Sequence, residues 1–277
     1  MNQRLLPAVL GVLVLSLATV GSVSDVKAQQ RERPATVDGK PNLNGIWQAR
    51  NSANWNLEAH PAEAIDDFWM LGSLAAIPAG RSVVVGGNIP YRPEALAQRD
   101  ENRAGWPAAD PETKCYMPGI PRAAYMPYPF QIVQGEGDHM LFSYTFANAN
   151  RVVYMNEADH VIAPVDTWMG QSNGSWEGDT LVIEVNSLLA DPWLDRAGNY
   201  HSNQARITER YSLIAPDILQ YEATMVDPET FTESWTIRMP LYRHIEEDAR
   251  LFDFHCVAYA EQLLYGDLET GGPPSTE

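Results

Sequence analysis

The stretch LQYEATM, residues 219–225, alternates strictly between apolar and polar side chains. Its apolar members, from Leu219 to Met225, fall on one face of an extended chain, because successive side chains of a strand point to opposite faces. Residues 233–239 (ESWTIRM) repeat the pattern with Trp235, Ile237 and Met239. This period predicts antiparallel strands with one face buried and the other facing water or a polar cavity.

Similar segments follow one another from residue 130 onward. They are short, rich in valine, isoleucine, threonine and aromatic residues, and separated by turn sequences such as GEGD (135–138) and DPE (227–229). The expected strands are 131–134, 140–146, 151–155, 180–185, 205–213, 218–226, 233–238 and 251–258. Strands without intervening helices predict a mainly β fold, an antiparallel meander. Closure of about eight strands into a small lipocalin-like barrel would remove the exposed edges.

The chain before residue 130 has a different character. Residues 29–44 are polar and predict an extended arm, and residues 43–48 (LNGIWQ) predict a short apolar strand. Ten prolines lie between residues 57 and 130, a density that excludes long regular elements. We therefore expect residues 45–129 to form a proline-rich wrap with one or two short helices, at 58–74 and 92–103, and residues 130–277 to form the barrel.

The first residues predict export. A start containing Arg4 is followed by an apolar run, 5–20, and by small residues ending in VKA at 26–28. This pattern predicts a signal peptide, residues 1–28, cut near Ala28, and a periplasmic or secreted mature protein. The alternative is an uncleaved membrane anchor, but the apolar run is short and interrupted by Gly11 and Ser16.

Charge and cysteine content limit the partners. The net charge of −17 at pH 7 argues against a nucleic acid or an anionic membrane. Cys115 and Cys256 are the two cysteines, and in an oxidising compartment they predict a single disulfide. Two separately buried thiols are the alternative, because sequence does not report their distance. The sequence leaves the oligomeric state open.

The histidines and glycines form no recognised cofactor motif. The six histidines, at positions 60, 139, 160, 201, 244 and 255, show no H-x-H or H-E-x-x-H spacing. A glycine-rich phosphate or dinucleotide loop after a strand is also missing from the sequence. Three distant histidines, such as His160, His201 and His255, could meet in a barrel, but we expect no resident metal and no cofactor.

Residues 170–174 (GQSNG) match the G-x-S-x-G pattern of serine hydrolases. That pattern marks a nucleophile only at a strand–turn–helix junction, which positions the oxyanion hole. Here a turn at 177–179 (EGD) and an expected strand follow instead. A hydrolase with Ser172 as nucleophile is therefore the third of three functional hypotheses.

The longer stretch WMGQSNGSWEGDTLV, residues 168–182, resembles the signature of a large, mostly uncharacterised group of exported bacterial proteins. Further points of resemblance are LNGIW (43–47), KC (114–115) with PGIPR (118–122), PFQI (129–132), WLD (193–195) and HS (201–202). They extend over nearly the whole chain after residue 28. The resemblance implies export and implies no particular reaction.

Titratable residues gather in the expected loop before strand 205–213. His201 beside Asp195 at a barrel mouth would suit general acid–base catalysis, because the histidine pKa lies near working pH. A buried Glu209 would be a third proton-transfer candidate. In the alternative interpretation Asp195 caps a turn before Gly198, His201 is a half-exposed loop residue, and Glu209 forms a structural ion pair with Arg210.

These residues lead to two main hypotheses about function. The first is a cofactor-independent lyase, hydratase or isomerase that acts on a small apolar or aromatic molecule in the barrel cavity. The second is a non-catalytic periplasmic binding protein that uses the same cavity. In strand 205–213 either the set with Glu209 or the set with Arg210 faces inward, never both. The predicted ligand-binding residues are Arg210, Tyr154, His160, Trp168, Trp176 and Tyr221.

Overall fold

The computed structural model describes residues 35–65, 76–155 and 162–258. The expected signal peptide, 1–28, and the candidate His160 lie outside the described residues. Among the residues that are described, no helix is long and apolar enough to cross a membrane.

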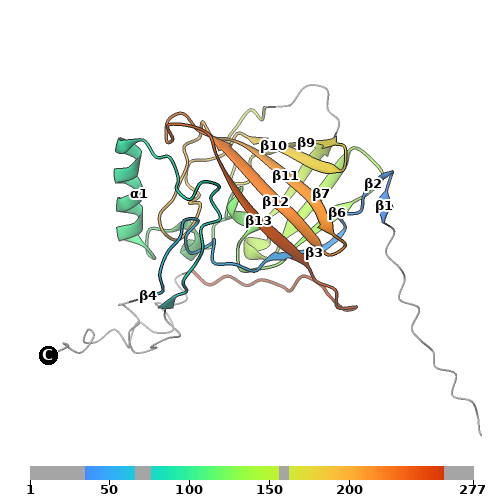
Figure 1. The fold of residues 1–277 in the computed structure, drawn as a ribbon, viewed down its shortest axis with the longest axis horizontal. Coiled ribbons are helices and arrows are strands. Elements are labelled where there is room, and N and C mark those ends of the chain that lie inside the picture. Colours follow the sequence, from blue (N-terminus) through green and yellow to red (C-terminus); the bar gives the residue numbers. More distant parts are fainter. Residues whose placement is uncertain (1–34, 66–75, 156–161, 259–277) are drawn as a thin grey trace, which may run out of the picture. The chain divides into compact units, whose positions relative to one another are not determined.

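Nine strands form a closed barrel, in the order β10-β11-β12-β13-β3-β6-β7-β8-β9 (Figure 1). Neighbouring strands are antiparallel except β8 and β9, which are parallel. The expectation of a mainly β fold closing into a small barrel is confirmed. The strands are β3 (Gly45–Ala49), β6 (Phe130–Gln134), β7 (His139–Tyr144), β8 (Asn150–Met155), β9 (Gln171–Glu177), β10 (Thr180–Asn186), β11 (Arg206–Ala215), β12 (Ile218–Val226) and β13 (Trp235–Arg243).

Three expectations about the strands need correction. β9 occupies 171–177, where the sequence interpretation placed a loop, because its small polar residues hide the strand period. β3 pairs with β13 and β6 and so belongs to the barrel, not to the wrap. Residues 251–258 form no strand in the structure, since β3 already occupies the edge of β13 that such a strand would need.

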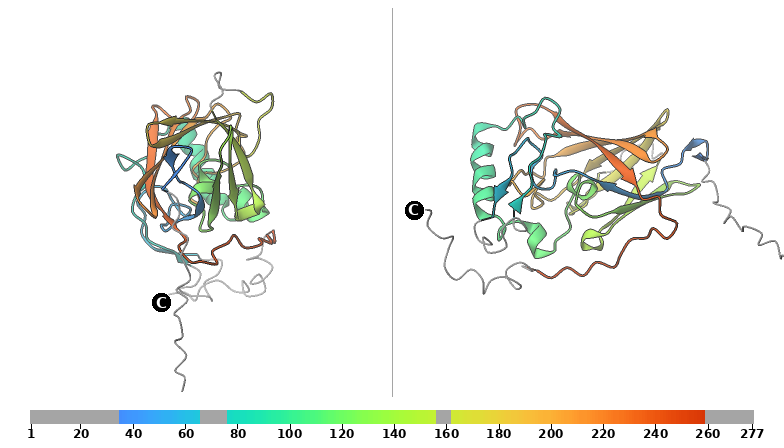
Figure 2. Two further views of the ribbon diagram at one scale, coloured as in Figure 1. Left: turned by 90° about the vertical axis from the view of Figure 1, so that its right-hand side faces the viewer. Right: turned by 60° about the horizontal axis from the view of Figure 1, so that its bottom comes forward.

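Short elements surround the barrel. The helix α1 (Pro93–Gly105) confirms the one expected near 92–103 and lies beyond one end of the barrel (Figures 1 and 2). In the described part of the other expected helix, 58–65, a two-residue strand forms instead. The remaining elements are β1 (Thr36–Val37), β2 (Lys40–Pro41), β4 (Glu63–Ala64), β5 (Ala76–Ile77) and the 3-10 helices η2 (Pro111–Lys114), η3 (Arg122–Ala124) and η4 (Phe146–Asn148).

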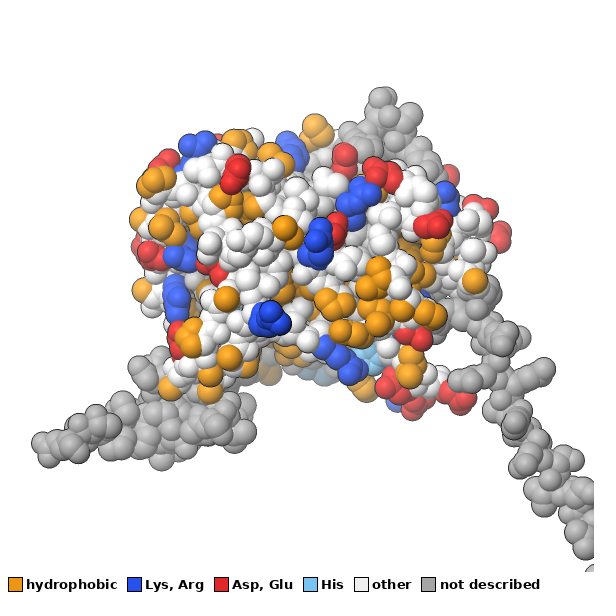
Figure 3. All heavy atoms as spheres, in the orientation of Figure 1, with side chains coloured by type: hydrophobic (Ala, Val, Ile, Leu, Met, Phe, Trp, Pro, Cys, Tyr) orange, Lys and Arg blue, Asp and Glu red, His pale blue; other side chains and the backbone are white. Residues whose placement is uncertain are grey.

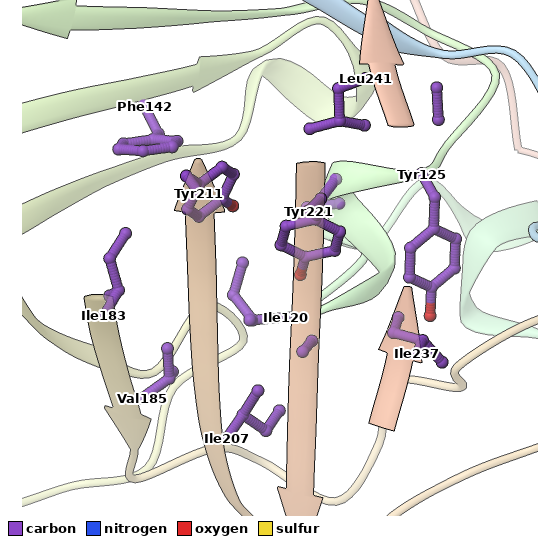
Figure 4. Close-up of a cluster of buried hydrophobic side chains, with 14 of the residues drawn as sticks. Ile120, Tyr125, Phe142, Ile183, Val185, Ile207, Tyr211, Tyr221, Ile237 and Leu241 are labelled. Atoms are coloured by element: carbon purple, nitrogen blue, oxygen red, sulfur yellow. The ribbon is translucent and has the colours of Figure 1, made fainter. Parts of the chain in front are cut away.

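A segment of the wrap fills part of the barrel interior. Residues 118–126, which we call the plug, are all buried and include η3. Ile120 and Tyr125 belong to the same hydrophobic core as Tyr221 and Ile237 of the strands (Figure 4). The Tyr125 hydroxyl donates to the carbonyl of Leu194 at 2.8 Å. Side chains of the plug therefore occupy part of the barrel interior where a ligand cavity was expected.

The predicted disulfide is present. Cys115 and Cys256 are bonded, with their Cα atoms 5.7 Å apart and a sequence separation of 141. The bond attaches residues 251–258 to the wrap just before the plug. Phe254 adds ring contacts there, with centroids 5.2 Å from Tyr128 and 5.1 Å from Phe146.

Candidate functional site

A groove opens where β8 and β9 diverge. Their parallel register begins at Val153 and Ser172, and ahead of that point the first half of β8 faces residues 167–171 across a space of about 340 Å³. We call this space the seam groove. Its lining residues are Met117, Asn150, Arg151, Val152, Tyr154, Thr167, Trp168, Met169, Gly170 and Gln171.

Glycine fixes the wall of the seam groove opposite β8. Gly170 has φ +67°, and a Cβ there would lie 2.6 Å from the carbonyl oxygen of Asn186 and 2.8 Å from Val185. A Cβ on Gly174 would lie 2.5 Å from the sulfur of Met155 on β8. Close packing therefore explains why glycine occupies both positions of the GQSNG motif, without any role in catalysis.

Ser172 does not have the surroundings of a hydrolase nucleophile. It lies inside β9 and is 1% exposed. Arg151 Nη1 donates to its hydroxyl at 3.3 Å, and a cation cannot act as the base. β9 continues through a tight turn with Gly178 at φ +60° into β10, so the helix that a nucleophile elbow requires does not follow.

Two predicted aromatic residues meet at the seam groove. Trp168 stacks on Tyr116 with ring centroids 5.0 Å apart, and Tyr154 makes an edge contact with His139 at 5.0 Å. Trp176 lines a different hollow of about 300 Å³ beside β1 and β2, and Tyr221, the fourth predicted aromatic residue, is fully buried. The sequence thus identified two residues of the groove, and the structure separates the other two from them.

Behind the seam groove, a buried polar cluster crosses the barrel interior. Arg151 Nη1 donates to Glu209 Oε2 at 2.6 Å, and Arg151 Nη2 lies 3.3 Å from the Tyr211 hydroxyl. The hydroxyls of Tyr211 and Tyr221 both donate to Glu209 Oε1, at 2.9 and 2.8 Å. Figure 4 shows the two tyrosines side by side on β11 and β12. Arg151 therefore joins the groove to the barrel interior.

Burial and charge fix the protonation of this cluster. Burial raises the pKa of Tyr211 and of Tyr221, and the nearby Glu209 carboxylate raises both further. Burial by itself lowers the pKa of Arg151, but the Glu209 carboxylate and the neighbouring Tyr144 and Tyr211 together outweigh it, and the pKa of Arg151 is above its ordinary value. The tyrosines consequently stay neutral and the arginine stays charged throughout the ordinary pH range.

Glu209 and Arg210 do not pair with each other. Ile207, Glu209 and Tyr211 form the inward set of β11, which settles the alternative left by the sequence. Arg210 faces outward and pairs with Glu177 at 2.8 Å, so it does not line the barrel. Adjacent residues of a strand point to opposite faces, which excludes the proposed Glu209–Arg210 pair.

Asp195 fits the turn-capping interpretation. Its carboxylate is fully buried and accepts hydrogen bonds from the backbone amides of Leu57, Ala197 and Asn199, at 2.9, 2.9 and 3.2 Å. The Asn199 side chain donates a further bond at 2.6 Å. Burial raises the pKa of Asp195 to about 6, although these hydrogen bonds lower it. The carboxylate holds the loop before Gly198 to the wrap.

His201 is separate from Asp195. It is 1% exposed rather than half-exposed, and its Nδ1 lies 2.9 Å from the carbonyl of Ser202. A carbonyl only accepts, so Nδ1 carries the hydrogen, and the buried Nε2 has no hydrogen-bond partner among the described residues. Burial lowers the pKa of His201. No hydrogen bond links the two residues in the described part of the chain, so the predicted dyad is not formed.

Sequence reasoning missed two groups of charged residues. Arg151 shares the inward face of β8 with Val153 and Met155, and an arginine within an apolar face was the available signal. In the wrap, Arg122 binds Asp110 through two 3.0 Å bonds and also contacts Glu112. These carboxylates are distant in sequence from the barrel motifs.

Within the described residues, no group of three or more histidine, cysteine or acidic side chains is arranged to hold a metal ion.

Comparison with known proteins adds little to this geometry. No family model matches the sequence, and no curated protein matches it. The chain is similar in structure to a mutant of the fluorescent protein UnaG, with 12% identity over 74% of this chain and 97% of that chain, and a TM-score of 0.31. We therefore define the protein by its own strands, as a plugged, closed β-barrel.

Proposed function

We propose that this protein is an exported binding protein for a small, flat aromatic molecule that carries an anionic or strongly polar substituent. The seam groove is the site, and one observation carries the proposal: Trp168 and Tyr154 line the same groove, and the guanidinium of Arg151 lies buried behind it. Pockets with aromatic walls and a few fixed polar groups are typical of small-molecule sites. The export signal and the bacterial group suggested by the sequence belong to the same proposal.

The buried polar cluster supports this function by holding Arg151 in place. Its contacts with Glu209 and the Tyr211 hydroxyl fix the guanidinium before any ligand arrives. Arg151 also lies against the ring of Phe142, with 4.7 Å between its Cζ and the centroid. A binding group that is already ordered loses little entropy when the ligand binds.

The surface also favours a small partner. The face drawn in Figure 3 carries acidic and basic side chains interspersed with hydrophobic ones. With a net charge of −17, long-range attraction of a polyanion is unfavourable. The polar substituent that we propose is therefore small and is recognised locally.

The test is a fluorescence titration with 8-anilinonaphthalene-1-sulfonate, a flat aromatic sulfonate. Trp168→Ala should weaken its binding about tenfold or more, because a large aromatic contact is lost. Trp176→Ala, in the other hollow, is the matched control and should leave the affinity unchanged. Equal weakening by both variants, or by neither, would refute the seam groove as the site.

Proton-transfer catalysis is the second proposal, and Glu209 is its candidate residue. In its favour, two neutral phenols each donate a hydrogen bond to the one carboxylate behind the groove. Its test is deuterium uptake from heavy water into the methyl group of 2-acetonaphthone. Uptake that Glu209→Gln abolishes would support an isomerase or lyase, whereas no uptake by the native protein would refute it.

A further inference from the structure

A second, smaller pocket lies in the wrap and shares no residue with the seam groove. We call it the wrap pocket, and it is formed around Trp55, His60, Trp106 and Arg196. Its volume is about 110 Å³, whereas a buried water needs roughly 10–15 Å³. The wrap pocket thus has room for several waters or for one ligand of a few heavy atoms.

Two buried polar atoms of the lining residues have no hydrogen-bond partner among the described residues. They are Nε2 of His60 and Nε1 of Trp106. His60 Nδ1 lies 2.8 Å from the carbonyl of Glu58 and so carries the hydrogen, which makes Nε2 an acceptor. The indole of Trp106 is a donor. Each unsatisfied buried group costs about 1–3 kcal/mol, so a polar ligand that reached both atoms would remove this cost.

Further donors belong to the same lining. Arg196 binds Glu112 through Nε and Nη2, at 2.9 and 2.6 Å, which leaves the hydrogens of Nη1 outside this fork. Asn56 accepts the backbone amide of Glu58 through Oδ1 at 2.9 Å, so its amide hydrogens are outside that bond. Donors therefore outnumber acceptors, which favours an anion that also carries one hydroxyl group.

The pocket walls pack against one another. The guanidinium of Arg196 lies 4.2 Å above the ring of Trp55, and Trp55 meets Trp106 edge to face at 5.9 Å. At the rim, Glu63 is paired with Arg103 at 3.2 Å, which offsets its negative charge. Aromatic walls and a paired rim suit a compact ligand.

We propose that the wrap pocket binds a small hydroxycarboxylate. Its carboxylate accepts hydrogen bonds from Trp106 and Arg196, and its hydroxyl donates to His60 Nε2. This site is independent of the seam groove, so failure of either proposal leaves the other standing.

Glycolate and acetate are the probes, followed through the indole N–H signals of the full chain by nuclear magnetic resonance. The signal that Trp106→Phe removes should shift on glycolate addition, and the signal that Trp176→Phe removes should not. Acetate, which lacks the hydroxyl, should bind several-fold more weakly. In His60→Asn, the amide replaces the Nδ1 donor and Nε2 is lost, so glycolate should bind no better than acetate.

Three results would overturn the proposal. They are no shift of the Trp106 signal at millimolar glycolate, which means that the pocket holds water only, equal affinity for both anions in the native protein, and a retained glycolate preference in His60→Asn. The other indole signals report whether each variant is folded, so loss of binding by unfolding is recognised directly.

Discussion

Removing the charge of Glu209 should destabilise the barrel more than removing both charges of its ion pair. Glu209→Gln keeps an oxygen for the hydroxyls of Tyr211 and Tyr221 but places an amide against Arg151, which is 4% exposed. A buried charge that loses its partner costs about 3–5 kcal/mol. That is a large part of the roughly 5–15 kcal/mol by which a protein is stable.

The double variant separates this cause from simple loss of packing. Arg151→Met combined with Glu209→Gln removes both charges while the amide oxygen still accepts from the tyrosines. We expect the double variant to be more stable than Glu209→Gln alone by at least about 1 kcal/mol, because it no longer contains an unpaired buried charge.

Urea unfolding of the native protein, both single variants and the double variant measures this coupling. The reasoning is refuted if the two single effects add, or if Glu209→Gln costs less than about 1 kcal/mol. Arg210→Met is the matched control, since its partner Glu177 is exposed on the outer face. It should cost no more than about 1 kcal/mol.

Three further changes test the fold. Because burial lowers the pKa of His201, the unfolded chain binds more protons there, and the contribution of His201 to the free energy of unfolding should fall as the pH drops below about 6.5, by up to about 1.4 kcal/mol per pH unit; in urea titrations the native protein should therefore lose more stability over this range than His201→Gln. Gly170→Ala should lower the melting temperature more than Gly178→Ala, because both have positive φ but only Gly170 is crowded, and equal losses would contradict the packing argument. Replacing Cys115 and Cys256 with serine should cost about 2–5 kcal/mol, and unchanged urea unfolding would show that the bond constrains little.

The barrel strands were predictable where each has one apolar face. In β12, Tyr221 and its alternate neighbours are buried, so the period of the sequence equals the period of the structure. β9 was missed because Ser172 faces the buried Arg151 and a side chain at Gly174 would collide with Met155 of β8. A strand that needs small residues on its inward face shows no hydrophobic alternation. The reason lies in the side chains of the neighbouring strand, which the local sequence does not contain.

The site was only partly predictable, because most of its geometry is non-local. Tyr154 and Trp168 were identified as ligand-binding residues, but their position outside the barrel depends on the divergence of β8 from β9. The plug was not foreseen, since its prolines suggested surface loops. Asp195 and His201 are close in sequence, yet their hydrogen bonds run to different partners.

The plug and the strand order also constrain the order in which the barrel can fold. β3 is made before the plug, but it pairs with β6 on one side and with β13, the last strand of the barrel, on the other. Strands β10 to β13 can join through local hairpins, which form quickly, whereas β3 must wait for distant partners. In a chain made from its N-terminus, β3 can pair with β6 early, but its other edge stays unpaired until β13 is made. Closing the barrel and enclosing the plug are then one and the same event.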